Sequence, residues 1–381
     1  MKINKSRPSH WLYLLAFTCQ ATLGLILRLV TERSAITLYG HKLNGNLLAL
    51  YQSCDKSTFL SMDLAYCRSL HAQGIRAQWA CGIGAALLLA RSKALISDHG
   101  LHSLELILTC YQKTGLKCFD VWHGIPFKGF DADDFRLQHR YDATWVASPL
   151  VRKLYIERFG FEPDRVVVTG YARTDALVEQ QACNLDIRKE LGLPETGAVV
   201  LFAPTWSQDA AGRSLYPFGY SEANFLAALS SIAEQHDATV ILRTHLNSDA
   251  SAEQEHPNIK RMPSSDWPDT ESILQISDIL ICDWSSIAFD FLLLDRPTIF
   301  LDVPPPFRKG FSLGPEFRFG PIVDCMPALT EALVCAMQSP DHYWRSHSEK
   351  HQEVKTTIYE DWADGQATQR CLAQLARACS T

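Results

Sequence analysis

The chain has 381 residues, of which 47% are hydrophobic and 20% are charged. This composition excludes a disordered chain and is typical of a globular protein with a large core, and the length is enough for two domains. The net charge of −6 gives no overall positive field, and no basic helix interleaved with aromatic residues is present, so nucleic-acid binding is not expected.

The first predicted element is an apolar helix near the N-terminus. Residues 11–30 are mostly apolar and follow three basic residues. A secretory signal, a membrane-spanning helix, a helix lying on the inner membrane surface and a helix docked on the soluble body all remain open. No clean cleavage site follows, and polar interruptions before Arg28 make the run marginal for spanning. We therefore predict that residues 1–33 associate with a membrane, as a peripheral segment or a single anchor.

From residue 34 onward, short apolar strands alternate with helices. Strands are expected at "AITLYG", "STFLSMD", "KALISDHG", "LKCFDVWHG", "ATWVAS" and "RVVVTG". After a break near residues 192–197, a second series follows at "AVVLFAPTW", "ATVILRTH", "SDILICD" and "PTIFLD". Strands that alternate with helices indicate parallel sheets covered on both faces. The sequence thus predicts two α/β domains, residues 34–194 and 195–326, and a helical tail at 327–381.

Polar residues follow five of these strands at the point where each strand ends. In chain order they are His123, Arg173 and Asp175, Thr205 and Trp206, Arg243 and His245, and Asp283 with Ser285 and Ser286. Each could be an ordinary loop residue. Ligands of open α/β sheets, however, bind beyond the carboxyl ends of the strands. Five successive strand ends therefore favour a binding site over an accidental arrangement.

The loop "VWHGIPFKGF" places an imidazole and an ammonium beside two residues that shape the backbone. A neutral imidazole can take up a proton near neutral pH, which makes His123 a candidate base. Gly124 is expected to let the backbone turn closely and Pro126 to stiffen the loop. Lys128 could act on an anion through its charge, and an ordinary solvent-exposed lysine explains it equally well.

The segment "ICDWSSIAFDFLLLD" predicts a buried strand followed by a helix that begins near Ser285 or Ser286. Free N–H groups and the helix dipole at such a start suit a diphosphate. Asp290 lies one turn further along the same face and could accept hydrogen bonds from ribose hydroxyls. Alternatively, the serines only cap the helix and Asp290 pairs with a cation such as Arg296.

Several other chemistries find no support in the sequence. The 12 cysteines are dispersed without a CxxC pair, as reduced and buried cysteines are, and no P-loop, HExxH or GxSxG motif occurs. The acidic cluster at residues 131–134 is more typical of a solvated turn than of a metal site. We expect no obligatory metal.

Taken together, the motifs resemble those of a known family. "WHGIPFKGF", "GYARTD", "APTW", "RTH" and "DWSSIAFDFLLLDRPTIF" occur in the same order in the CDP-glycerol glycerophosphotransferases, the teichoic-acid primases and polymerases and their capsule relatives. "LYGHKLNGNLLALY" and "DGQATQR" are similar to the two ends of that family's domain. The resemblance covers residues 36–370. It implies a GT-B-like fold with two Rossmann-like domains facing a central cleft, residues 34–194 on the acceptor side and 195–326 binding the CDP donor.

The resemblance also implies roles for individual residues. His123 and His245 would be the active-site histidines, with His123 as the base for the acceptor hydroxyl. Arg243, Ser285 and Ser286 would contact the donor phosphates and Asp290 the cytidine ribose. Possible accessory residues are Lys128, Arg173, Asp175, Thr205 and Asp283. The chain departs from the family pattern at Ala172, Leu246 and Trp284, which leaves the donor and acceptor open but not the reaction type.

The implied reaction transfers glycerol phosphate or ribitol phosphate from CDP-glycerol or CDP-ribitol to a hydroxyl of a lipid-linked or polymeric acceptor. It would take place at the cytoplasmic face of the cell membrane and release CMP without an obligatory cofactor. Three alternatives remain: a glycosyltransferase or a sugar-nucleotide epimerase of the same architecture, and a non-catalytic protein of a polysaccharide-assembly complex.

Overall fold

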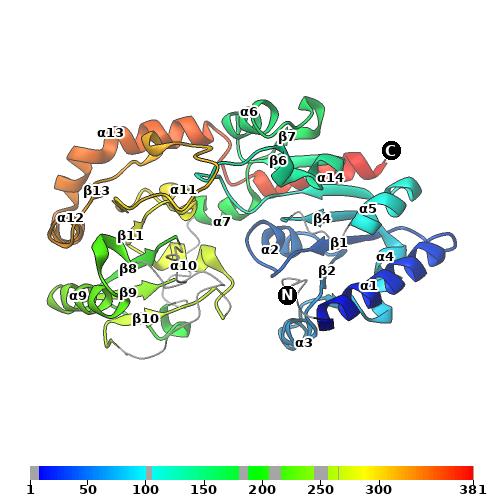
Figure 1. Cartoon of the computed structure of the whole chain (residues 1–381), viewed down its shortest axis with the longest axis horizontal. Coiled ribbons are helices and arrows are strands. Elements are labelled where there is room, and N and C mark those ends of the chain that lie inside the picture. The colour runs from blue at the N-terminus through cyan, green and yellow to red at the C-terminus, as the bar shows by residue number, and fades with distance from the viewer. Residues whose placement is uncertain are drawn as a thin grey trace. The chain divides into compact units, whose positions relative to one another are not determined.

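The computed structural model describes residues 8–99, 105–179, 188–205, 216–243, 256–264 and 266–380. The chain divides into two compact units, each with its own parallel sheet (Figure 1). Unit 1 contains Met1–His123, Asp131–Asp175 and Trp362–Thr381, and unit 2 contains Gly124–Phe130 and Ala176–Asp361. The division differs from the predicted domain ranges, because the tail is shared between the units and the segment after His123 belongs to unit 2.

Unit 1 is built on a seven-stranded parallel sheet. Its strands are β1 (Ala35–Tyr39), β2 (Ser57–Ser61), β3 (Ala77–Trp79), β4 (Ser92–Ser97), β5 (Lys117–Asp120), β6 (Ala143–Val146) and β7 (Val166–Val168), in the order β3-β2-β1-β4-β5-β6-β7. Leu38 of β1 lies between Phe59 of β2 and Ile96 of β4. The strand order reverses between β1 and β4, as in a Rossmann fold, so a crevice is expected at the carboxyl ends of these two strands.

Helices cover both faces of this sheet because successive strand residues point to opposite sides. The helices of unit 1 are α1 (Pro8–Leu27), α2 (Gly45–Gln52), α3 (Leu64–Ala72), α4 (Ile83–Arg91), α5 (Glu105–Tyr111), α6 (Pro149–Glu157) and α14 (Ala367–Ser380). Leu38 and Ile96 pack with residues of α2 and α14, whereas Tyr39 and Leu95 pack with residues of α1, α4 and α5. The apolar helix predicted near the N-terminus is thus present, and it packs on unit 1.

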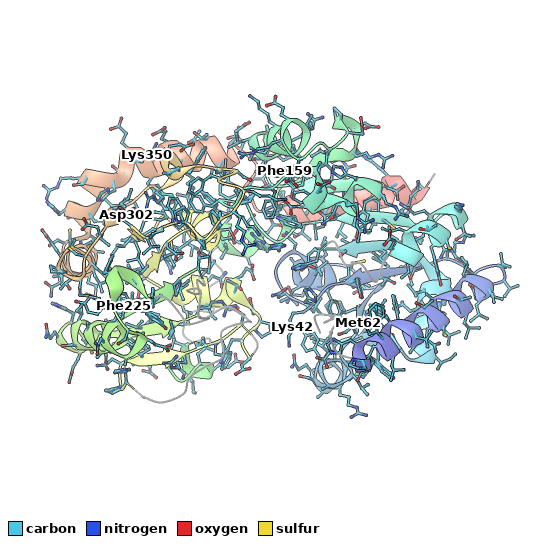
Figure 2. The ribbon with its side chains drawn as sticks, viewed as in Figure 1. Lys42, Met62, Phe159, Phe225, Asp302 and Lys350 are labelled. Carbon is cyan, nitrogen blue, oxygen red and sulfur yellow. The ribbon has the colours of Figure 1, made fainter. Side chains whose placement is uncertain are left out.

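Unit 2 has a second parallel sheet with six strands. They are β8 (Ala198–Ala203), β9 (Ala238–Leu242), β10 (Ile259–Arg261), β11 (Ile279–Cys282), β12 (Thr298–Leu301) and β13 (Ile322–Val323), in the order β10-β9-β8-β11-β12-β13. The order reverses between β8 and β11. The helices of unit 2 are α9 (Glu222–Gln235), α10 (Thr270–Ile276), α11 (Ile287–Leu292), α12 (Met326–Gln338) and α13 (Pro340–Tyr359), while α7 (Asp175–Val178) begins at the unit boundary. Phe225 of α9 is fully buried in the core of this unit (Figure 2).

The short segment Gly124–Phe130 packs against residues 310–312 of unit 2. The Gly129 amide donates to the Gly310 carbonyl at 2.7 Å, and the Ser312 amide donates to the Phe127 carbonyl at 2.7 Å. A side chain at position 129 would bring its Cβ within 2.3 Å of the Lys309 carbonyl oxygen, so only glycine fits there. The Phe127 ring lies 4.5 Å from that of Phe289 in α11.

Candidate functional site

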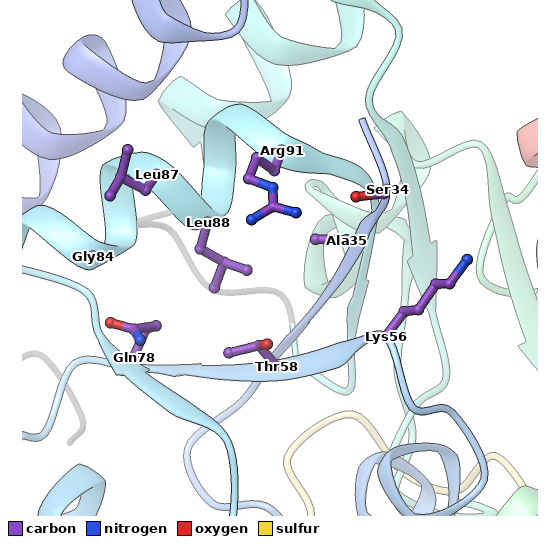
Figure 3. A pocket seen from close by; sticks show the side chains of 9 residues that line it. All are labelled: Ser34, Ala35, Lys56, Thr58, Gln78, Gly84, Leu87, Leu88 and Arg91. Carbon is purple, nitrogen blue, oxygen red and sulfur yellow. The ribbon is translucent and has the colours of Figure 1, made fainter. Parts of the chain in front are cut away.

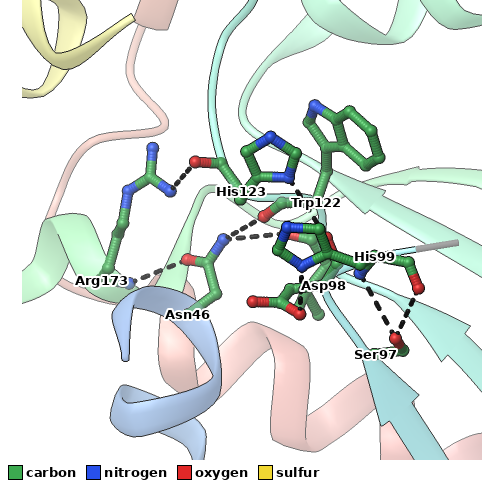
Figure 4. A network of polar contacts seen from close by, with 8 residues as sticks. Asn46, Ser97, Asp98, His99, Trp122, His123 and Arg173 are labelled. Atoms are coloured by element: carbon green, nitrogen blue, oxygen red, sulfur yellow. Dashed lines mark hydrogen bonds and ion pairs between the residues drawn. The ribbon is translucent and has the colours of Figure 1, made fainter. Parts of the chain in front are cut away.

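His123 lies at the carboxyl edge of the unit 1 sheet. Polar residues that follow β1 and β4, the two strands between which the strand order reverses, lie close to it. Asp98 and His99 come directly after β4, and His41 follows β1. The His99 ring stacks on the His123 ring with 4.5 Å between centroids and an interplanar angle of 6° (Figure 4). The His41 ring meets the other histidine, His99, edge-on at 4.9 Å. Three imidazoles therefore gather where a Rossmann-like sheet binds its ligand.

Asp98 contacts both stacked histidines. Its carboxylate Oδ1 lies 2.7 Å from Nδ1 of His99, and its backbone carbonyl oxygen lies 3.3 Å from Nδ1 of His123. A proton on Nδ1 of His123 can donate to this carbonyl, which leaves Nε2 as the atom that can accept a proton. This arrangement suits His123 to a base.

Asn46 of α2 holds the backbone that carries His123. Its amide Nδ2 donates to the carbonyl oxygens of Val121 and Trp122, each at 2.8 Å. Its Oδ1 accepts the backbone N–H of Arg173 at 3.1 Å. Trp122 has a φ of 26°, a left-handed conformation that costs free energy for a large side chain. The predicted sharp turn is therefore made by Trp122 rather than Gly124, and the buried Asn46 side chain stabilises it.

The two predicted accessory residues of "GYARTD" have different surroundings. Arg173 is buried, and its guanidinium donates to the His123 carbonyl at 2.6 Å (Figure 4). The carboxylate of Asp175 accepts the N–H groups of Ala367 at 3.0 Å and Thr368 at 2.7 Å. Arg173 thus belongs to the surroundings of His123, whereas Asp175 caps the first turn of α14 and holds that helix on unit 1.

The electrostatics of this site keep His123 uncharged. The pKa of His123 is lowered to about 3, although part of its side chain is exposed. Desolvation by the surrounding protein is the largest cause, the charge of His99 acts in the same direction, and the charge of Asp98 opposes both. Asp120, at the end of β5, is fully buried, and this burial together with the charge of Asp98 raises its pKa to about 8. At neutral pH His123 is therefore neutral and Asp120 is mostly protonated.

Lys128 belongs to unit 2, whereas His123 belongs to unit 1. Its side chain is exposed, and its ammonium lies 5.1 Å from the centroid of the Phe130 ring. Its backbone forms an isolated antiparallel bridge with Phe311. These contacts favour the interpretation of Lys128 as a solvent-exposed lysine on a segment whose backbone is fixed.

In unit 2, the predicted residues that the structure describes lie along the carboxyl edge of the second sheet. Thr205 follows β8, and Asp283 to Ser286 follow β11, so they flank the point where the strand order reverses. The Asp283 carboxylate accepts the backbone N–H of Thr205 at 2.7 Å and of Trp284 at 2.6 Å. Burial raises the pKa of Asp283 to about 6, and these hydrogen bonds oppose the rise. Asp283 therefore ties the two strand ends of the crevice together.

Ser285, Ser286 and Asp290 lie at the start of α11. The hydroxyl of Ser286, at the N-cap position, bonds no backbone N–H of the helix, because this residue already has helical angles of φ −63° and ψ −13°. The interpretation that Ser286 caps the helix is therefore wrong. Both serines are partly exposed and Asp290 is buried. Arg296, the alternative partner considered for Asp290, donates to the carbonyls of Gln275 and Ser277.

Arg243 follows β9 on the other side of β8. Its buried guanidinium donates to the Trp267 carbonyl at 3.0 Å and to the Thr270 hydroxyl at 2.8 Å, and burial lowers its pKa. The other predicted residues of these loops, Trp206 and His245, lie outside the described residues. The structure thus brings His123 and Arg173 together in unit 1, and Thr205 and Asp283 together in unit 2.

Four polar residues near His123 were not predicted from the sequence: His41, Asn46, Asp98 and His99. Two signals could have found them: "SDHG" ends a predicted strand, and His41 and Asn46 lie in "LYGHKLNGNLLALY", directly after the predicted strand "AITLYG". Within the described parts of the chain, no group of three or more His, Cys, Asp and Glu side chains could hold a metal ion. A pocket of about 520 Å³ lies elsewhere in unit 1, where Arg91 and Leu88 of α4 face Ala35 and Thr58 (Figure 3). No predicted site residue lines it.

Comparison with known proteins gives consistent similarities over both units. The family model for CDP-glycerol:poly(glycerophosphate) glycerophosphotransferase matches residues 40–376. The teichoic acid glycerol-phosphate transferase of Staphylococcus aureus (strain NCTC 8325 / PS 47) is 28% identical, with 68% of this chain and 71% of that protein covered. The teichoic acid ribitol-phosphate polymerase TarK of the same strain is 29% identical over 60% of this chain, which spans only 48% of the polymerase.

Solved structures show the same fold. The wall teichoic acid polymerase TagF superposes with a TM-score of 0.74 and 18% identity over 98% of both chains. The UDP-GlcNAc 2-epimerase of Neisseria meningitidis superposes with a TM-score of 0.57 and 12% identity over 90% of this chain and 99% of that chain. These likenesses confirm the predicted GT-B-like α/β fold class. They also show that the architecture alone does not distinguish a phosphotransferase from an epimerase.

Proposed function

Because the chain belongs to the CDP-glycerol:poly(glycerophosphate) glycerophosphotransferase family, we propose that it transfers glycerol phosphate or ribitol phosphate from a CDP-alditol to a hydroxyl of a membrane-associated cell-surface polymer or its lipid-linked precursor. The chain is a transferase of this family. The observation that supports the proposal is a neutral imidazole, His123, whose Nδ1 faces a carbonyl at the ligand-binding edge of a Rossmann-like sheet.

In the proposed reaction, the acceptor oxygen attacks the β-phosphorus of the CDP-alditol. A new P–O bond forms, the bond between this phosphorus and the oxygen bridging to the α-phosphorus breaks, and CMP leaves. Nε2 of His123 takes the proton of the acceptor hydroxyl. A loose transition state develops little charge on the attacking oxygen, so the orientation of the hydroxyl matters more than the strength of the base. A weakly basic but uncharged His123 fits this requirement.

Release of CMP tests this proposal directly. The full chain is incubated with CDP-glycerol or CDP-ribitol and a lipid-linked acceptor, and CMP and acceptor mass are followed. A parallel reaction contains UDP-sugars in place of CDP-alditols, and another contains EDTA to check that no metal is obligatory. CMP release that depends on the acceptor supports the proposal. Consumption of a UDP-sugar with both CDP-alditols inert would instead indicate a glycosyltransferase or epimerase.

The donor is proposed to bind unit 2 at the start of α11. Ser286→Ala removes a partly exposed hydroxyl, and Asp290→Ala removes the buried carboxylate. One hydrogen bond to a charged group is worth about 1.5–3 kcal/mol, so each change should weaken CDP-alditol binding by roughly ten- to a hundredfold. Titration calorimetry measures the affinity, with exposed Asn224→Ala on α9 as the control. Wild-type affinity in both variants would refute this site.

Helix α1 is proposed to bind the enzyme to the cytoplasmic face of the membrane. Among the described residues, only this helix is long and apolar enough to cross a membrane. One face of α1, however, is already buried against the rest of unit 1. Phe17, Ala21 and Gly24 are packed on unit 1, and a Cβ at Gly24 would lie 2.5 Å from the Tyr111 hydroxyl. We therefore propose that α1 lies along the membrane surface and does not span it.

Arg28, directly after α1, supports this interpretation. Its buried guanidinium donates to the carbonyls of Leu89, Ala90 and Ser92 and to the Thr114 hydroxyl at 2.8 Å. Moving α1 away from unit 1 would break these bonds and leave buried carbonyls without a partner.

The outer face of α1 has the chemistry of a lipid-facing surface. Trp11, Leu12, Leu15 and Ile26 are more than half exposed, and the helix contains no charged residue. Such a surface is unusual for a helix in contact with water. The hydroxyls on this face, for example that of Thr18, donate to the carbonyl four residues earlier, so they need no water.

The double variant Leu12→Glu/Leu15→Glu is expected to reduce binding to vesicles of anionic phospholipid by at least tenfold, since each lost leucine insertion is worth roughly 1.5–3 kcal/mol. Co-sedimentation measures the bound fraction. Ile322→Glu, at an exposed apolar residue of unit 2, is the matched control. Point changes are preferable to deletion of residues 1–33, which would uncover the core under α1. Equal binding of the double variant and wild type would rule out this surface.

A further inference from the structure

Asp98 and His99 form a polar pair beside His123, and neither has a role in the reaction proposed above. We propose that His99, held by Asp98, is a positioning residue that fixes the plane of the His123 imidazole and keeps its Nε2 available to the acceptor hydroxyl. This inference rests on the proposed function and names further residues of the same site.

The contacts provide two constraints on the His123 ring. Nearly parallel stacking against His99, at 4.5 Å and 6°, restricts the tilt of the ring. The bond from Nδ1 to the Asp98 carbonyl, at 3.3 Å, restricts its rotation. Because Asp98 and His99 are consecutive residues, both constraints come from one short piece of backbone. Any shift of this backbone would therefore move both contacts together.

That backbone is itself held in place. The Ser97 hydroxyl donates to the His99 carbonyl at 2.8 Å and accepts the His99 amide at 3.3 Å. The Asp98 side chain is buried against Gly40, where a Cβ would lie 2.8 Å from the carboxylate oxygen. With Oδ1 2.7 Å from Nδ1 of His99, this fixed carboxylate sets the orientation of the second ring. The stacking surface offered to His123 is thus preorganised.

The pair also acts on the charge of His123. The charged groups that act on the His123 ring are His99 and Asp98, which follow β4, and Arg173, which follows β7. Asp120 is buried at the end of β5, and the His41 ring contacts His99. After desolvation, His99 is the largest influence that lowers the pKa of His123, and Asp98 raises it. Phenylalanine at position 99 would keep a flat ring but remove the charge, which separates stacking from electrostatics.

The experiment compares His99→Phe, His99→Ala and Asp98→Asn in the full chain. His99→Ala is expected to lower kcat by about tenfold or more, as a misplaced catalytic group does, with the KM for the CDP-alditol unchanged. His99→Phe should retain more activity than His99→Ala because it keeps the stacked ring. His71→Phe, at an exposed histidine of α3 that bonds the Ala77 carbonyl, is the matched control.

A second measurement does not depend on turnover. The ¹³C-histidine NMR signal of His123, identified by its loss in His123→Ala, is followed against pH. The pKa of His123 should rise in His99→Phe, because an opposing positive charge is lost, and fall in Asp98→Asn, because a favourable negative charge is lost. Opposite shifts support the proposal, and identical titrations together with a wild-type kcat in His99→Ala would overturn it. If the wild-type protein turns over no CDP-alditol but the two NMR shifts appear, the proposed function is wrong, whereas the effect of Asp98 and His99 on His123 is supported.

Discussion

His123→Ala is expected to lower turnover by about 10²–10⁴-fold, the usual contribution of a general base, while the protein stays folded. The fold should persist because the His123 side chain is partly exposed and its backbone carbonyl, which accepts the bond from Arg173 at 2.6 Å, remains in the variant. CDP-alditol affinity should stay close to that of wild type, since the proposed donor residues belong to unit 2. Initial rates of CMP release and circular dichroism measure the two properties.

Lys128→Ala is the appropriate comparison for this variant. Lys128 is exposed and lies five residues along the same loop, so its loss tests whether charge in the loop matters by itself. We expect turnover close to wild type. A folded His123→Ala protein with near-normal turnover would show that His123 is not the base. A protein that fails to fold would identify His123 as a structural residue.

Asn46→Ala is expected to have the largest combined effect on stability and activity. Its buried amide makes three hydrogen bonds, to the carbonyls of Val121 and Trp122 and from the amide of Arg173. Leaving such buried groups without partners costs roughly 1–3 kcal/mol, so the free energy of unfolding should fall by at least that amount. Turnover should also fall, by up to about 10²-fold, because the left-handed backbone at Trp122 can relax and displace His123.

Urea unfolding and CMP release distinguish the two contributions. Asn224→Ala in unit 2, on the exposed face of α9, is the control for removing an asparagine amide from a helix. If Asn46→Ala keeps both the unfolding midpoint and the turnover of wild type, the hydrogen bonds of Asn46 do not hold the His123 loop in its active conformation. Loss of stability with full turnover of the folded fraction would restrict Asn46 to a structural role.

The sequence was sufficient for the fold class because alternation of strands and helices is a local pattern. Most strands and the apolar helix α1 are found where they were predicted. Strands β3, β10 and β13 were missed because each has only two or three residues and none has the run of three valines that identified the equally short β7. Thr205, Arg243 and Asp283 also lie at the edge of their sheet, because each follows the end of a strand by one or two residues.

The surroundings of His123 could not be predicted from local patterns. His41 and His99 meet only because β1 and β4 are neighbours, although β2 and β3 lie between them in the chain. Asp175 was expected near the site, yet its partners are amides almost two hundred residues later, at the start of α14. Such contacts depend on strand order and on the return of the chain, which no single segment specifies.

The return of α14 to unit 1 has a consequence for synthesis of the protein on the ribosome. Cys371 and Leu375 of α14 complete the core on one face of the first sheet, whose strands were all made before residue 170. All of unit 2, in contrast, has been translated by residue 361. Domains usually form in the order in which they emerge from the ribosome. Here the N-terminal unit would finish last, so chains truncated after residue 361 and released from the ribosome should carry a protease-resistant unit 2 beside a protease-sensitive unit 1.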